Sequence, residues 1–248
     1  MRLPSLLKQM HISRSLRGRL LLGLAATWCL VVSLVLGMSW HLGKSMVQET
    51  NLSHLRYEAT LLADEVTQQV EMRFQALERL RTVIGATDDT AWISHQLQQN
   101  DSLLALFEGV VVANREGTIV ADWPSVAGRA GLETSELEYF RMLRGTRRPY
   151  VSEPFQGRAS GMPMVIVGVP RLTEQGEFEG FVGGVLSLDS GGIFSRLAKV
   201  RLGESGYAGI ATASGKVLSH PNRSLISGPV PDKQFNPGLD LALDGWEG

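Results

Sequence analysis

The sequence has almost no cysteine and no excess of charge of either sign. Its 248 residues include one cysteine, Cys29, and 24 basic and 25 acidic side chains give a formal net charge of −1. One cysteine excludes a disulfide framework and a zinc site built on paired cysteines. A balanced charge provides no broad positive field for phosphate backbones, so we expect no nucleic-acid partner.

Motifs for catalysis, nucleotide binding and metal binding are also missing. The sequence contains no Gly-x-Ser-x-Gly motif, no P-loop and no dinucleotide-binding fingerprint followed by a helix. None of the five histidines is paired with another ligand residue at metal-binding spacing, and His220, before a proline, is interpreted as structural. We therefore expect no enzyme activity, no metal and no cofactor in this chain.

One long segment is entirely uncharged. Residues 20–40 form a run of 21 residues that as a helix would span about 31 Å, close to the ~30 Å hydrocarbon core of a bilayer. Basic residues and no acids precede it, and the first acid after it is Glu49. The positive-inside rule predicts a cytoplasmic basic tail at 1–19, a transmembrane helix at 20–42 and the rest of the chain outside the cytoplasm.

Two other interpretations of this segment are a cleaved signal peptide and a buried core helix. The run exceeds the ~7–15 residues of a signal-peptide core and no small-x-small cleavage site follows it. Its lack of polar residues and its one-sided basic flank disfavour a core helix. We therefore favour an uncleaved anchor.

Residues 43–86 show the pattern of one long helix. Apolar residues recur every three or four positions from Leu52 to Ile84, and no proline or glycine interrupts residues 44–84. At about 1.5 Å per residue this helix is about 60 Å long, more than a small domain covers. We predict a stalk helix that forms a homodimer; the alternative is that the stripe packs only within its own chain.

The rest of the chain alternates short helical and strand-like segments. Asn114 to Gly117 form a turn between two β-branched runs, which predicts a hairpin. Glycines inside later strands, at 168, 183 and 184, indicate bends or a close approach of a ligand to the backbone. The expected helices are 91–100, 137–144 (stopped by Gly145) and 192–200, and the expected strands are 108–113, 118–123, 150–155, 162–172 and 178–188.

The stretch from residue 138 to 189 also resembles a known family. Tyr139-Phe140, then SEPF, GRASGMPMV, VPR and GFVGGVLSLD occur in the order and spacing of the double Cache sensor domain of bacterial receptors. A second hairpin pattern, AGIATASGKVLSHP, is similar to the start of the family's second lobe. The resemblance implies an α+β fold: a membrane-anchored helix followed by PAS-like antiparallel-sheet lobes.

The location and the domain organisation follow from that resemblance, which implies a bacterial inner-membrane protein with a periplasmic sensor region and a periplasmic stalk helix at 43–86. The membrane-distal Cache lobe is expected at 87–200 and the start of the membrane-proximal lobe at 201–248. Because about 48 residues are too few for the proximal lobe of this family, we expect that lobe to be incomplete in this chain.

The resemblance also implies ligand-binding residues. In amino-acid-binding double Cache domains an arginine stands two residues before an aromatic pair, and Leu137 takes that place here. Because leucine cannot hold a carboxylate as the arginine fork does, we expect a small amine or polyol rather than an α-amino acid. The implied ligand-binding residues are Tyr139, Phe140, Phe155, Arg158 and Asp189.

Each of these residues also has a purely structural interpretation. Tyr139 and Phe140 fit core aromatics, Asp189 fits a cap for the helix expected near Gly192, and Arg158 fits an anchor for its own turn. Both interpretations stay open on the sequence alone.

The expected function is extracytoplasmic sensing of a small molecule for a membrane-bound signalling receptor. By association with similar Cache sequences we expect a cyclic-di-GMP output domain outside this chain. The alternatives are the sensor of a histidine kinase, a phosphatase or a chemoreceptor, or a structural dimerisation module without a ligand.

Overall fold

The computed structural model describes residues 16–87, 89–189, 192–202 and 206–231, with side chains omitted at 16–18 and 42–53. The chain divides into two units, residues 1–57 and 58–248. Helix α1 (Leu16–Ile84) is continuous and includes residues of both units. The prediction of separate membrane and stalk segments therefore corresponds to a single helix of 69 residues.

The first unit holds one segment that is long and apolar enough to cross a membrane. It runs from Arg19 to His41, 23 residues with a mean hydropathy of 2.3, and none of it is buried. These properties match a span by length and composition, as the uncharged run predicted.

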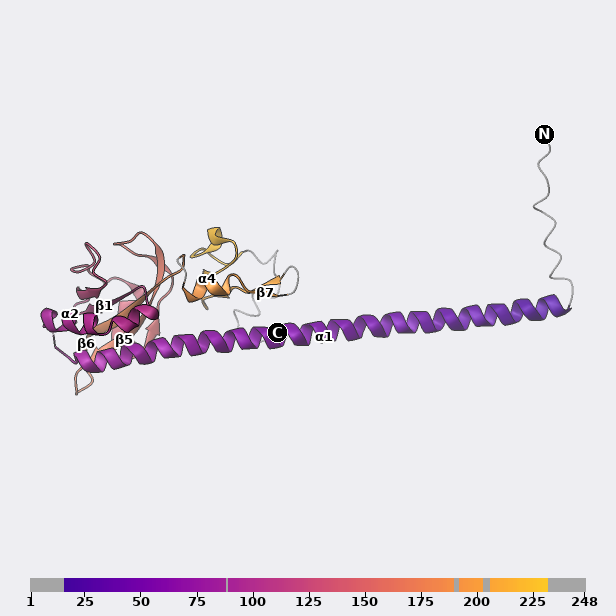
Figure 1. Cartoon of the computed structure of the whole chain (residues 1–248), viewed down its shortest axis with the longest axis horizontal. Coiled ribbons are helices and arrows are strands. Elements are labelled where there is room, and N and C mark those ends of the chain that lie inside the picture. Colours follow the sequence, from indigo (N-terminus) through magenta and orange to yellow (C-terminus); the bar gives the residue numbers. More distant parts are fainter. Residues whose placement is uncertain (1–15, 88, 190–191, 203–205, 232–248) are drawn as a thin grey trace, which may run out of the picture. The chain divides into compact units, whose positions relative to one another are not determined.

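The second unit contains a six-stranded antiparallel sheet (Figure 1). Its strand order is β2-β1-β6-β5-β3, with β4 also paired to β5. The predicted hairpin and later strands are confirmed, although the run at 150–155 divides into two short strands. The strands are β1 (Gly109–Ala113), β2 (Ile119–Trp123), β3 (Tyr150–Val151), β4 (Phe155–Gln156), β5 (Pro163–Leu172) and β6 (Phe178–Ser187).

The two faces of this sheet belong to different hydrophobic clusters. Successive strand side chains point to opposite faces, so Val110 and Val112 pack with α1 and with α2 (Thr90–Gln99), whereas Val111 packs with α3 (Glu138–Thr146). The α1 face holds Leu77, Leu80 and other apolar residues of the helix. The sheet therefore lies between the stalk helix and α3.

Glycines inside the strands make room for side chains of the same chain. A Cβ at Gly168 would lie 2.7 Å from Cδ1 of Leu143 on α3. A Cβ at Gly184 would overlap the ring of Phe107. The sequence pattern indicated bends or the close approach of a ligand at these glycines. The space beside Gly168 and Gly184 is filled instead by side chains of the same chain, Leu143 and Phe107.

The end of α3 differs from the expected one. The helix continues through Gly145 to Thr146 and ends at Arg147, which adopts a left-handed conformation with φ 54°. Arg147 takes the position that glycine most often fills after a helix.

Smaller elements follow the large sheet. Helix α4 (Ile193–Leu197) precedes two two-stranded sheets, and Ser219 on β10 donates a buried hydrogen bond of 2.6 Å to the carbonyl of Phe194. Part of the predicted proximal lobe, residues 203–205 and 232–248, lies outside the described residues. The remaining elements are η2 (Asp101–Ala105), β7 (Arg201–Leu202), β8 (Gly206–Tyr207), β9 (Ile210–Ala211), β10 (Val217–Ser219) and η3 (Arg223–Leu225).

Candidate ligand-binding site

Helix α3 covers one face of the large sheet and closes a cavity against it. Its buried residues Tyr139, Phe140 and Leu143 lie at positions i, i+1 and i+4, which share one side of a helix. Arg141 and Arg144, on the other side of the helix, are exposed. This amphipathic pattern places the aromatic pair against the strands.

This cavity, named the Tyr139 cavity after one of its lining residues, has a volume of about 60 Å³. A single water needs roughly 10–15 Å³ of such space, so the cavity holds several waters or a very small ligand. Its walls are mostly apolar and come from β1, β2, β4, β5, β6, α3 and two loops. The lining residues are Val111, Ile119, Arg129, Leu132, Glu133, Thr134, Leu137, Tyr139, Phe155, Gly157, Arg158, Ala159, Ser160, Met164, Ile166 and Val185.

Two arginines line the cavity from different loops. Arg158, after β4, donates from Nη1 to the backbone carbonyl of Glu133 at 3.0 Å. Arg129, after β2, has its Nη1 3.6 Å from a carboxylate oxygen of Asp122, and both of these side chains are largely buried. Arg158 therefore joins the two loops at the cavity, and Asp122 holds Arg129 in place.

Tyr139 supplies the phenol of the site. Its ring lies 5.5 Å from that of Phe155 and 5.7 Å, edge-on, from that of Phe181. Burial raises the pKa of Tyr139 to about 12, although the Thr134 side chain and the charge of Arg158 act in the opposite direction. The phenol is therefore a neutral hydrogen-bonding group at any physiological pH.

The structure brings three of the five predicted ligand-binding residues together. Tyr139, Phe155 and Arg158 all line the cavity. Phe140 lies in the core instead, with its ring 5.6 Å from that of Phe178. Asp189 lines a different cavity, beside α4 and η3.

The structural interpretations of Asp189 and His220 have different outcomes. Asp189 does not cap α4: the N-cap residue is Gly192, without a side-chain hydrogen bond. His220 has structural contacts, because its Nδ1 accepts from the backbone N–H of Asn222 at 2.9 Å and its ring lies against Tyr207.

Sequence reasoning missed Arg129 and Thr134. Arg129 is in a glycine- and alanine-rich loop with no periodic pattern, and its partner Asp122 is seven positions earlier. Thr134 donates to the carbonyl of Gly117 at 2.6 Å, a contact across 17 residues. Asp122 within the hairpin was the one available signal, because a carboxylate in a buried strand needs a partner.

Residues 43–245 match the profile of the Cache domain family, in its double Cache form. The helix and the sheet around a small cavity agree with this match. The chain belongs to the Cache domain family. The long helix followed by an antiparallel-sheet domain, predicted from the sequence resemblance, is confirmed in this fold.

Known Cache proteins similar to this chain are chemoreceptors. The methyl-accepting chemotaxis protein McpA of Pseudomonas putida is 23% identical over 236 residues, which are 94% of this chain and 35% of that protein. The chain thus spans about a third of the length of that curated relative.

Solved structures with the same fold are ligand-binding domains of chemoreceptors. That of Pseudomonas fluorescens CtaA with L-isoleucine has a TM-score of 0.66 at 20% identity, over 78% of this chain and 77% of that chain. That of Pseudomonas aeruginosa PctC with GABA has a TM-score of 0.60 at 23% identity, over 75% and 82%.

The ligand class expected from Leu137 is contradicted. Several solved Cache domains of this fold are complexes with amino acids, including L-serine, L-isoleucine, L-alanine and L-glutamine. The physical reason is visible in the cavity: Leu137 lines it, but so do two arginines at other positions, Arg129 and Arg158. The site therefore keeps positive charge although position 137 has no arginine.

Proposed function

We propose that this chain is the extracytoplasmic sensor of a chemoreceptor and that it binds a small α-amino acid in the Tyr139 cavity. The observation that carries the proposal is the pair Arg129 and Arg158 lining one apolar cavity beside the Tyr139 phenol. Guanidinium groups bind carboxylates with two parallel hydrogen bonds. Their presence in a Cache cavity supports recognition of a carboxylate.

The proposed roles follow from the chemistry of the wall. Arg158 and Arg129 bind the ligand carboxylate, and the Tyr139 hydroxyl donates to it or accepts from the ammonium group. Glu133, the acid that lines the cavity among the described residues, attracts the ammonium group. Leu137 and Val185 contact the side chain.

The size of the cavity restricts the ligand. Ligand pockets commonly measure ~300–1,000 Å³, and this cavity of about 60 Å³ is much smaller. Alanine and serine are therefore preferred over large amino acids, unless Arg158 releases Glu133 and its loop moves outward.

Calorimetric titration of the full chain in nanodiscs tests this proposal. L-alanine and L-serine should bind, and alaninamide, which lacks the carboxylate, should bind at least tenfold more weakly. Arg158→Ala should weaken L-alanine by about ten- to a hundredfold, since a hydrogen bond to a charged group contributes roughly 1.5–3 kcal/mol. Arg141→Ala, on the exposed side of α3, is the control; equal losses in both variants would contradict the proposal.

We also propose the membrane arrangement expected from the sequence. The tail is cytoplasmic, the Arg19–His41 segment spans the inner membrane and the Cache domain is periplasmic. Protease added to spheroplasts should degrade the region after residue 42, and its complete protection would contradict this orientation.

A homodimer through α1 completes the proposed receptor. Leu61, Met72 and Val83 are 49%, 42% and 50% exposed. Their spacing of 11 residues places them on one side of the helix, where a second copy would cover them.

The proposed output is chemotaxis signalling. The similar proteins are chemoreceptors, and nothing in the comparisons supports the cyclic-di-GMP output expected from the sequence. A hybrid that joins this chain to the signalling region of a methyl-accepting chemotaxis protein should restore swimming responses to L-alanine in a receptorless strain.

A further inference from the structure

A second cavity lies beside α1, separate from the Tyr139 cavity. Its volume is about 460 Å³, and it is lined by α1, the segment before β1, β6 and α4. Adjacent residues of β6 separate the two cavities, because Val185 lines the first and Leu186 lines the second. Since neighbouring strand residues point to opposite faces, the cavities lie on opposite faces of the sheet.

The wall of the second cavity contains a buried arginine with unused hydrogen-bonding capacity. Arg73 on α1 is only 4% exposed. Its Nη1 donates to the backbone carbonyl and to the side-chain oxygen of Gln69, each at 2.8 Å. Its Nε is buried without a partner within the described part of the chain. A buried cation with an unpaired donor favours an anionic partner.

A second positive charge lines the same cavity. Arg196 on α4 is exposed, and its charge adds to burial in lowering the pKa of Arg73. No acid within the described residues forms an ion pair with either guanidinium. Two like charges that form no ion pair repel each other.

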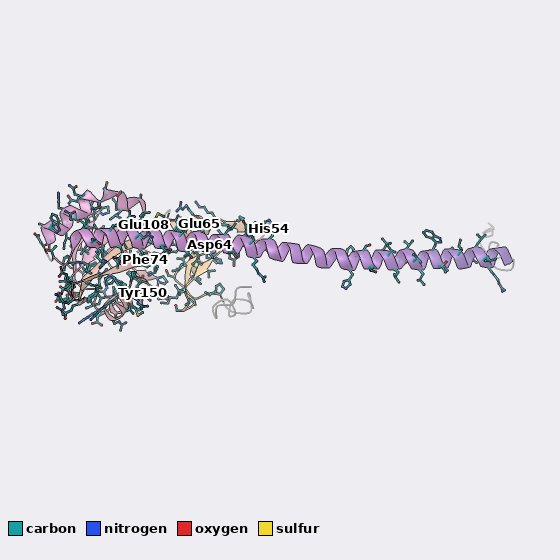
Figure 2. The ribbon with its side chains drawn as sticks, turned by 90° about the horizontal axis from the view of Figure 1, so that it is seen from below. His54, Asp64, Glu65, Phe74, Glu108 and Tyr150 are labelled. Carbon is teal, nitrogen blue, oxygen red and sulfur yellow. The ribbon has the colours of Figure 1, made fainter. Side chains whose placement is uncertain are left out.

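Glu108 is the acid that lines this cavity among the described residues. Its Oε2 accepts from the backbone N–H of Ser187 at 2.6 Å, which holds the carboxylate against the end of β6. Figure 2 labels Glu108, which precedes β1, and Phe74, which follows Arg73 on α1. The position of a bound anion is therefore at the arginines and away from Glu108.

The rest of the wall is apolar. Leu106, Phe107, Leu186 and Ile193 surround the space. These residues offer no partner to a fully hydrated inorganic ion but do cover a hydrocarbon chain. Charge and apolar surface together indicate an amphiphilic anion.

We propose that this cavity is a second ligand site, which binds an organic carboxylate with a short apolar chain. The carboxylate binds between Arg73 and Arg196, and the chain packs on Phe107 and Ile193. Such a ligand offsets one of the two positive charges and joins α1 to α4. The ligand thus contacts α1 on the face of the sheet opposite the Tyr139 cavity.

Calorimetry with hexanoate on the full chain in nanodiscs tests the site, with empty nanodiscs subtracted. Hexanoate should bind, whereas acetate (charge without chain) and hexanol (chain without charge) should each bind at least tenfold more weakly. Equal binding of hexanol, or no binding of hexanoate, would overturn the proposal.

Matched variants locate the binding. Arg73→Gln and Arg196→Gln should each lower hexanoate affinity about tenfold or more, and Arg79→Gln, on the exposed side of the same helix, should not. Because Arg196 is exposed, its variant decides the matter even where Arg73→Gln disturbs folding. Unchanged hexanoate binding in Arg196→Gln would refute the site.

One more variant separates this proposal from the amino-acid proposal. Arg158→Ala should leave hexanoate affinity unchanged, and Arg196→Gln should leave L-alanine affinity unchanged. Loss of hexanoate binding in Arg158→Ala would assign hexanoate to the first cavity and overturn the second.

Discussion

Arg171 on β5 donates from Nε to the carbonyl of Gly85, the residue that follows α1, at 3.1 Å. Its other nitrogens donate to the carbonyls of Thr87 and, at 3.4 Å, Ala113, and the residue is completely buried. Carbonyls at the end of a helix lack intrahelical partners and carry its negative pole. One arginine of the sheet thus anchors the end of the stalk helix.

Replacement of this arginine should loosen that anchor. We expect Arg171→Met to lower the free energy of unfolding by about 3 kcal/mol, because it leaves buried carbonyls without donors. Urea unfolding followed by circular dichroism measures the change. Arg115→Met is the control: its ion pair with Glu179 is 3.8 Å long and its side chain is 55% exposed, so its cost should stay below ~1 kcal/mol. Similar costs for both variants would show that Arg171 is no anchor.

Tyr139 should make the domain sensitive to alkali. Burial raises its pKa in the folded chain to about 12, above the ordinary value of 10. The resulting stabilisation is complete below pH 10 and is lost as the pH rises from 10 towards 12. Tyr139→Phe should therefore flatten the decline of unfolding free energy over this range.

Tyr150 contributes to the same pH range. Its pKa is also raised to about 12, by burial and by Glu138, whose carboxylate accepts from the phenol at 2.5 Å. The double variant Tyr139→Phe with Tyr150→Phe should therefore show a smaller decline of unfolding free energy between pH 10 and 12 than Tyr139→Phe alone. An identical decline in the wild type and in Tyr139→Phe would contradict the role of burial at Tyr139.

Gly157 should control the volume of the Tyr139 cavity. A Cβ there would overlap Cε of Met164 and lie 2.7 Å from Oγ of Ser160, and all three residues line the cavity. Because the end of a methionine is flexible, Gly157→Ala should push Met164 inward at a stability cost below ~1.5 kcal/mol.

Ligand binding should respond more strongly than stability to that substitution. We expect L-alanine affinity to fall about tenfold in Gly157→Ala, measured by calorimetry. In Gly145→Ala the new methyl group meets nothing within 4 Å, so affinity should not change there. Unaltered binding in Gly157→Ala would show that the ligand lies elsewhere.

The exposed apolar residues Leu61, Met72 and Val83 on α1 should mediate self-association. Leu61→Glu with Met72→Glu should reduce cross-linking between copies in membranes, because charges replace the apolar surface that a partner would cover. Ala63→Glu, about half a turn away from Leu61, is the control. Undiminished cross-linking in the double variant would exclude this surface as the interface.

The fold could be predicted in large part because it depends on local patterns. Alternation along Val110 to Val112 and the turn at Asn114 to Gly117 define the first hairpin, which the structure confirms. The helical spacing from Leu52 to Ile84 likewise gave one uninterrupted helix.

What covers an apolar stripe could not be predicted from spacing. Leu62 and Val66 belong to the repeat that suggested a dimer, but they pack against the core of their own domain. Leu61 and Met72 lie outside that repeat and remain exposed. Periodicity shows that a face is apolar; which neighbour contacts it depends on the tertiary fold.

Only those site residues that stand in a recognisable sequence motif could be predicted. Tyr139 lines the cavity as expected from its place in the aromatic pair. Arg129 did not emerge, because its position depends on the Asp122 contact across a loop. Asp189 follows β6, and no sequence pattern shows that it turns toward α4 instead of toward α3.

The carboxylate of Glu153 accepts from the hydroxyls of Thr212 and Ser214, at 3.0 and 2.8 Å. Glu153 is two residues before Phe155, which lines the amino-acid cavity, whereas Thr212 and Ser214 are in the turn between β9 and β10. These two hydrogen bonds join the segment beside the Tyr139 cavity to the turn of the smaller sheet. A ligand that displaced Phe155 would therefore also pull on the smaller sheet through Glu153.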